Sequence, residues 1–106
     1  MAALKEVMEK LREKIASPPS MQGVTATYQF VLEGEGGGNY LCRFVEGQGS
    51  IEEGTAENPN VTITMQAGDF IDLVSGRLSA TMAFMTGKLK ISGDFGLALK
   101  LQGLLG

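Results

Sequence analysis

Apolar and polar positions follow two different periods along this chain, and the two periods mark its helices and strands. Residues 4–15 place apolar side chains every three or four positions with charged side chains between them, which is typical of an amphipathic helix. Ser17-Pro18-Pro19 ends this helix, because proline lacks the backbone N–H that a helix needs. The apolar face of the predicted helix consists of Leu4, Val7, Met8, Leu11 and Ile15.

A period of two replaces the helical period in the next part of the chain. Residues 24–33 alternate between apolar and polar side chains, which predicts a half-buried strand. Glycine-rich turns then lead to a second strand over residues 40–45 and to a short third strand around Ile51. We expect these three strands to form an antiparallel meander. Glu52 and Glu53 suit an exposed sheet edge, where charge discourages pairing with other chains.

The second half of the chain mixes both periods. Residues 61–65 alternate Val, Ile and Met with Thr, which predicts a fourth strand. Two short helices follow, the first ended by Gly76 and the second capped by Ser79. Residues 88–92 predict a fifth strand with its lysines outward, and Asp94 caps a final helix. The predicted order αββββααβα is an α+β pattern.

Length and composition bound the class of protein. The 106 residues match one domain, so we expect residues 1–106 to share a single core. With 43% apolar and 20% charged residues, the composition is that of a globular protein. Residues 1–14 carry charges and no apolar signal region, and no apolar run approaches the ~18 residues of a membrane span. A cytoplasmic location is the resulting expectation.

Charge and residue chemistry exclude several functions. The net charge of -3 argues against a general nucleic-acid binder, which needs clustered Lys and Arg. The charge is uneven: residues 1–60 hold five basic and nine acidic residues, and residues 61–106 hold four basic and three acidic ones. Without histidine, and with Cys42 as the one cysteine, the common zinc, haem and iron–sulfur ligand sets are missing. We therefore expect no metal site, no cofactor and no disulfide.

No motif in the sequence points to catalysis. The glycines after the first predicted strand do not form a dinucleotide fingerprint, since Asn39 replaces the third glycine and a strand follows. Gly87-Lys88 is not a phosphate-binding loop, because Leu89 stands where Ser or Thr is needed. Nucleophilic hydrolysis generally needs a positioned base, and the chain offers no histidine for that role. We expect a protein that is not an enzyme and has no catalytic residue.

The last predicted helix, residues 94–105, carries more apolar surface than packing on one sheet requires. At 100° per residue its apolar side chains cover about 200°, roughly twice the usual stripe. A ligand between helix and sheet, a partner chain, or a core that surrounds the helix more fully would each cover this arc. The pattern leaves all three open. The arc contains Leu97, Ala98, Leu101, Leu104 and Leu105, extended by Phe95 and Leu99.

Several segments together resemble a known family. The most distinctive is Gly-Lys-Leu-Lys-Ile-Ser-Gly-Asp at residues 87–94, which an apolar helix follows. In these segments the chain closely resembles the sterol carrier protein 2 domain, also called nonspecific lipid transfer protein, whereas the first helix matches in pattern only. The segments that carry the resemblance are residues 61–65, 69–70, 75–78, 85–94 and 97–101.

The resemblance implies a fold and a function. It implies a five-stranded, largely antiparallel sheet covered by helices on one face, enclosing an apolar tunnel for fatty acids, acyl-CoA esters, sterols or phospholipids. A binding site for such ligands needs a suitable shape and an apolar lining, and it does not need a sequence motif of polar residues. The tunnel is predicted to be lined by Phe30, Phe44, Phe70, Val74, Met82, Met85, Leu97, Leu101 and Leu104.

Other partners follow from the same features. Lys88, Lys90 and Lys100 could attract anionic head groups, so transient membrane contact is an expectation. The alternative to a carrier is an interaction module that uses the C-terminal helix to form a homodimer or to dock on an enzyme of lipid or isoprenoid-quinone metabolism. The ending Leu104-Leu105-Gly106 is not the peroxisomal signal common in eukaryotic members, which favours a bacterial-type domain.

Overall fold

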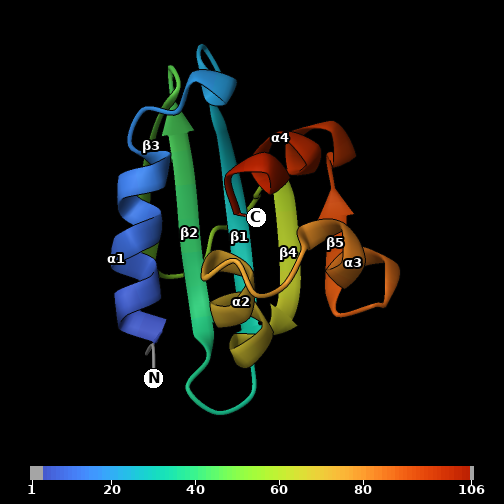
Figure 1. Ribbon diagram of the computed structural model, residues 1–106. Coiled ribbons are helices and arrows are strands. Elements are labelled where there is room, and N and C mark those ends of the chain that lie inside the picture. Colours follow the sequence, from blue (N-terminus) through green and yellow to red (C-terminus); the bar gives the residue numbers. More distant parts are fainter. Residues whose placement is uncertain (1–3, 106) are drawn as a thin grey trace.

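The strands form one five-stranded mixed sheet in the computed structural model, which describes residues 4–105 (Figure 1). Its strand order is β3-β2-β1-β4-β5. Three neighbouring pairs run antiparallel, and β1 and β4 run parallel. The largely antiparallel sheet is therefore confirmed, and β3 lies at an edge as its glutamates predicted. The strands are β1 (Ala26–Glu33), β2 (Gly38–Val45), β3 (Gln48–Glu53), β4 (Val61–Gln66) and β5 (Leu89–Gly93).

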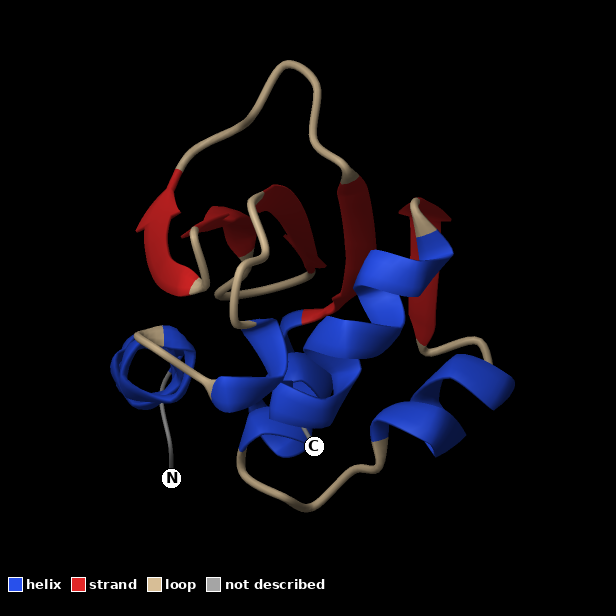
Figure 2. Cartoon of the chain, turned by 90° about the horizontal axis from the view of Figure 1, so that it is seen from above, coloured by secondary structure: helices blue, strands red, loops and turns tan. Residues whose placement is uncertain are grey.

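The helices gather on one face of this sheet (Figure 2). Their positions in the chain confirm the predicted order αββββααβα, with a short 3-10 turn added after the first helix. The predicted α+β class and the one-sided covering are thus both observed. The helices are α1 (Leu4–Ile15), η1 (Pro19–Met21), α2 (Ala67–Val74), α3 (Ala80–Met85) and α4 (Phe95–Leu105).

The connection from β3 to β4 crosses the face that the helices leave open (Figure 2). It must do so because β4 lies beside β1, with Phe30 opposite Ile63, rather than beside β3. Gln29 holds the connection: its Nε2 donates to the Gly54 carbonyl at 3.1 Å, and its Oε1 accepts from the Ala56 amide at 2.7 Å. Gln29 is only 4% exposed, so these bonds satisfy an amide that would otherwise be costly to bury.

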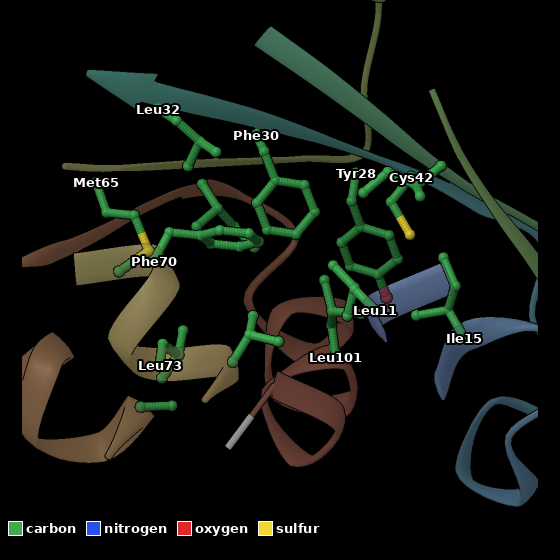
Figure 3. Packing of buried hydrophobic residues seen from close by; sticks show 14 of the residues in the cluster. Leu11, Ile15, Tyr28, Phe30, Leu32, Cys42, Met65, Phe70, Leu73 and Leu101 are labelled. Carbon is green, nitrogen blue, oxygen red and sulfur yellow. The ribbon is translucent and has the colours of Figure 1, made fainter. Parts of the chain in front are cut away.

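The main core lies between the sheet and the helices (Figure 3). Alternate residues of β1 point into it, because successive strand side chains face opposite sides. The Phe30 ring packs edge-on against the Phe70 ring of α2, with 5.4 Å between the ring centroids. The Tyr28 ring packs edge-on against the Phe44 ring, with 5.8 Å between the centroids. Leu11 of α1 is 1% exposed and completes this side of the core. The amphipathic first helix is therefore confirmed.

A glycine allows α1 to end close against the sheet. The Gly49 amide donates to the Ala16 carbonyl at 3.2 Å. A Cβ at Gly49 would collide with the Ile15 carbonyl oxygen and lie 2.7 Å from the Phe44 ring. Glu46 and Gly47 form the turn between β2 and β3, with φ angles of 52° and 83°. Strand β3 therefore begins at Gln48, earlier than the sequence pattern suggested.

This close approach makes a stability prediction. Gly49→Ala should lower the free energy of unfolding by about 1–3 kcal/mol, because the added methyl forces α1 away from β3. Gly68→Ala in α2 is the matched control: a Cβ there meets nothing within 4 Å, and alanine should raise stability by about 0.5–1 kcal/mol. Urea unfolding followed by circular dichroism measures both. Equal stability of Gly49→Ala and wild type would contradict the proposed contact.

Candidate functional site

A narrow apolar cleft lies between α3, α4 and the β4–β5 side of the sheet. Its volume is about 10 Å³, which corresponds to roughly one water-sized sphere. An acyl chain therefore requires this space to widen, and the tunnel that the resemblance implies stays a prediction. The cleft is lined by Ile63, Ala80, Leu89, Ile91, Ala98 and Gln102.

The sheet wall of the cleft follows from the pairing of β4 with β5. Ile63 pairs with Ile91, so both side chains face the helices. Leu89 shares their face and is 5% exposed. Lys90 pairs with Thr64 on the opposite face and is exposed, as its alternation with the apolar residues predicted. The β5 alternation thus separates an apolar wall from a charged outer surface.

Side-chain caps set where the two helices of the cleft begin. The Ser79 hydroxyl accepts a hydrogen bond from the Met82 amide at 3.4 Å, and Asp94 Oδ1 accepts one from the Leu97 amide at 3.1 Å. Both caps were predicted from the sequence and are confirmed. The turn after α3 includes Gly87 at φ 78°, a conformation that glycine adopts without strain.

Two surface contacts join α3 to α4 over the cleft. Gln102 Nε2 donates to the Thr81 hydroxyl at 3.0 Å, and this hydrogen bond is exposed to solvent. The Phe84 and Phe95 rings lie 5.6 Å apart, and both side chains are exposed. Neutral exposed hydrogen bonds and aromatic pairs each contribute about 0.5–1.5 kcal/mol. The outer closure of the cleft is therefore weak.

A buried tyrosine holds α4 on the sheet from the inner side. The Tyr28 hydroxyl donates to the Leu97 carbonyl at 2.8 Å, and the Tyr28 side chain is fully buried (Figure 3). Burial raises the pKa of Tyr28 to about 12, with further contributions from Cys42 and Asp94. The hydroxyl therefore stays protonated, and stays a donor, throughout the physiological range of pH.

The fold covers only part of the apolar arc of α4. Ala98 and Leu101 are 2% and 1% exposed, and Leu97 and Leu104 are half-buried against the core. Phe95 and Leu99 remain 47% and 51% exposed. A fuller surrounding core thus accounts for one side of the arc, and the other side is exposed to solvent. The side chain of Leu105 lies outside the described residues.

The predicted tunnel residues occupy two different places. Seven of the nine belong to the core or pack against it. Met82 and Met85 instead face solvent, at 53% and 74% exposure. Whether any of the nine lines a ligand site stays a prediction. The seven are Phe30, Phe44, Phe70, Val74, Leu97, Leu101 and Leu104.

None of the residues that line the cleft was among the predicted nine. The search of the sequence favoured large apolar side chains, whereas the cleft exists where small ones leave room. Ala80 and Ala98 are 3% and 2% exposed, and they stand on the inner faces of two adjacent helices. Alanine at a core-facing helix position is the signal that could have indicated this space.

The site offers apolar contact and no group for proton transfer. No acidic, basic or thiol side chain lines the cleft. Burial raises the pKa of the Cys42 thiol to about 12, so the thiolate needed for nucleophilic attack is absent at neutral pH. Within residues 4–105, no group of three or more Cys, Asp or Glu is placed to hold a metal ion. No helix in this described range is long and apolar enough to cross a membrane.

Comparison with known sequences identifies a family and longer relatives. Residues 4–106 match the family model of the SCP-2 sterol transfer family. The chain is 42% identical over 98 residues to hydroxysteroid dehydrogenase-like protein 2 of Xenopus tropicalis, a match that covers 92% of the chain and 24% of that relative. The human protein of the same name is 35% identical, with 97% of the chain and 25% of that protein covered. The chain therefore spans about a quarter of the length of these relatives.

Comparison with solved structures supports the fold. The solution structure of palmitated SCP2L2 from Aedes aegypti superposes with a TM-score of 0.81 at 23% identity, covering 98% of this chain and 95% of that one. The UbiJ-SCP2 ubiquinone synthesis protein superposes with a TM-score of 0.69 at 16% identity, covering 96% and 91%. At such identities the similarity establishes a shared fold.

The Tyr28 hydroxyl gives a prediction about pH. Since the pKa of Tyr28 rises from 10.0 to about 12 on folding, the folded state holds this proton more tightly. The resulting stability is fully present below pH 10 and is lost as pH rises through 12. In Tyr28→Phe the free energy of unfolding should decline less over this range, and near pH 7 it should be about 1 kcal/mol lower because the hydrogen bond to Leu97 is lost.

Urea unfolding at a series of pH values measures this effect. Cys42→Ala is the matched comparison, because burial also raises the pKa of that thiol to about 12 from 9.0. The stability that the Cys42 thiol proton contributes should therefore be lost from about pH 9, one unit below the pH at which the loss at Tyr28 begins. An alkaline decline in Tyr28→Phe as steep as that of wild type would show that the Tyr28 proton does not contribute.

Proposed function

The chain belongs to the SCP-2 sterol transfer family, and we propose that it binds and carries an apolar lipid ligand between its sheet and helices α3 and α4. The ligand class comprises fatty acids, acyl-CoA esters, sterols and phospholipids. The observation that carries the proposal is the apolar cleft, whose helical walls are Ala80, Ala98 and Gln102 and whose outer closure is weak.

The energetics of widening the cleft are favourable. Burying a tail of about ten carbons gains on the order of 8 kcal/mol, and association costs about 4 or more. Breaking the hydrogen bond from Gln102 to Thr81 and separating Phe84 from Phe95 costs at most about 3 kcal/mol together. With the association cost at its lower estimate, the gain exceeds the two costs by about 1 kcal/mol for a tail of this length, so longer tails should bind more tightly and shorter ones should not bind.

Helix α3 is the wall that moves in this proposal. It has six residues, of which Ala80 and Ala83 are buried, so little apolar area anchors it. Helix α4 is held more firmly, by the Tyr28 hydrogen bond and by Leu101. An outward shift of α3 would extend the cleft toward the core residues that were predicted to line the tunnel. A rotation of α3 about its axis would bring Met82 and Met85 to the ligand.

In this proposal, residues 1–106 are one lipid-binding domain that performs no chemistry of its own.

A specific observation supports a second candidate, an interaction module. The matched relatives are about four times as long and are named as dehydrogenase-like proteins, so a domain of this kind accompanies further chain there. A structural neighbour is a ubiquinone synthesis protein. Docking on an enzyme or homodimerisation through α4 is this second candidate, and a cytoplasmic location stays a prediction.

Native mass spectrometry of protein purified without detergent tests the carrier proposal. We expect lipid mass on a monomer, whereas the interaction module would give a ligand-free dimer. A fluorescent fatty acid at micromolar concentration provides the second measurement. Finding no bound lipid together with no uptake would overturn the proposal.

Filling the cleft should block uptake. Ala98→Leu places extra carbons where ligand methylenes would lie; excluding about two of them costs about 1.6 kcal/mol, or roughly tenfold in affinity. Ala26→Leu is the matched control, since Ala26 is a buried alanine on β1 outside the cleft. Equal fatty-acid affinity in the two folded variants would place the ligand elsewhere. Leu101 is less suitable for such a test, because a polar replacement at 1% exposure would unfold the domain.

A further inference from the structure

The two edges of the sheet differ in what covers them. At the β3 edge, helix α1 contacts the outward-facing backbone, where the Gly49 amide donates to the Ala16 carbonyl at 3.2 Å. The Arg12 guanidinium donates to the Ile51 carbonyl at 3.2 and 3.3 Å. A further strand could pair with β3 only by displacing α1. Strand β5 forms the opposite edge of the sheet.

The outward-facing backbone of β5 has no such partner. The Asp94 amide donates at 2.9 Å to the carbonyl of Asn60, the residue that precedes β4. Because backbone groups alternate in direction along an antiparallel strand, those of Leu89 and Ile91 face away from β4. Among residues 4–105, no other group forms a hydrogen bond with these outward-facing amides and carbonyls. The β5 edge is therefore open to a further strand.

Helix α3 offers an apolar contact beside this edge. It contacts β5 and projects outward beyond it on the helical face of the sheet (Figure 2). Thr81 and Phe84 of α3 are turned toward α4, where they contact Gln102 and Phe95. At 100° per residue, Met82 therefore lies on the side of α3 that is turned away from α4, and it is 53% exposed. A strand added to β5 would lie over this side of α3.

Two lysines border the edge on the opposite face of the sheet. Lys90 points away from the helices, Lys88 precedes it by two residues, and both are exposed. They line a hollow together with Glu33 and Asp69. Among the described residues neither lysine forms a salt bridge, so both ammonium groups are available to a partner. A matching strand has acidic side chains on this face and apolar side chains on the face toward α3.

We propose that the β5 edge binds an extended segment of a partner protein, in which apolar and acidic residues alternate, as an antiparallel sixth strand. The segment's backbone pairs with the outward-facing amides and carbonyls of Leu89 and Ile91. Its acidic side chains lie opposite Lys88 and Lys90, and its apolar side chains pack on Met82. The inference does not depend on the carrier function, because the segment stays outside the cleft.

A second copy of this chain fits the β5 edge less well. Two paired β5 strands would lie about 4.8 Å apart, whereas packed helices need about 8–10 Å between their axes. Because α3 projects beyond β5, the α3 helices of the two copies would compete for the same space (Figure 2). A single extended segment brings no helix with it and avoids this collision.

Fluorescence anisotropy with a labelled synthetic peptide of alternating valine and glutamate tests the proposal. The charge of this peptide keeps it monomeric at neutral pH. Wild type should bind it at least tenfold more tightly than a peptide of alternating valine and lysine. Lys88→Gln with Lys90→Gln should reduce binding of the glutamate peptide at least tenfold, whereas Lys10→Gln with Lys14→Gln on α1 should leave it unchanged.

A methylated peptide and hydrogen exchange test the backbone contact. Methylation of the valine amides removes the donors that face β5, so this peptide should bind at least tenfold more weakly. In the complex, NMR should show hydrogen exchange at the Ile91 amide slowed at least tenfold, with no change at the Ile51 amide on the closed β3 edge. Equal binding of the glutamate and lysine peptides, full binding of the methylated peptide, or slowing at Ile51 in place of Ile91 would overturn the proposal.

Two further measurements separate this site from the cleft and from self-association. Lys88→Gln with Lys90→Gln should keep the uptake of a fluorescent fatty acid, because neither lysine lines the cleft. Normal uptake by wild type without peptide binding would refute only the strand site. Light scattering that shows a wild-type dimer which the glutamate peptide dissociates would assign the edge to a second copy and overturn the proposal.

Discussion

The parallel pairing of β1 with β4 decides the architecture of this protein. It sets β4 beside the central strand β1, so the chain after β3 has to cross β2 and β1 on the open face before it can pair. Gln29 stabilises that crossing, because its buried side-chain amide forms hydrogen bonds with the backbone of the connection at Gly54 and Ala56. The helices lie on the other face of the sheet, where α3 and α4 both contact β5.

Unequal anchoring of the helices connects this architecture to function. Helix α4 is fixed from inside by the hydrogen bond of Tyr28 and by the burial of Leu101, whereas α3 contributes mainly Ala80 and Ala83 to the interior. Small side chains leave a gap and make few packing contacts. The alanines of α3 therefore provide part of the space for the proposed ligand and also allow α3 to move. In the proposed carrier function, this gap is the place where the ligand binds.

Among the described residues, the same two helices also carry all the large exposed apolar side chains except Val45. In the proposed carrier function, a ligand that enters between α3 and α4 has to separate the exposed Phe84 and Phe95 rings. The long relatives add that such a domain can also be part of a larger chain.

Local signals in the sequence determined the elements of this protein, and tertiary structure determined the site. Periodicity and caps such as Ser79 and Asp94 act within a few residues, so the helices, the strands and their order could be predicted. The parallel neighbour of β1, the burial of Gln29 and the gap between Ala80 and Ala98 join residues far apart in the chain. No local pattern encodes such contacts, because a side chain's surroundings are fixed only when distant elements pack.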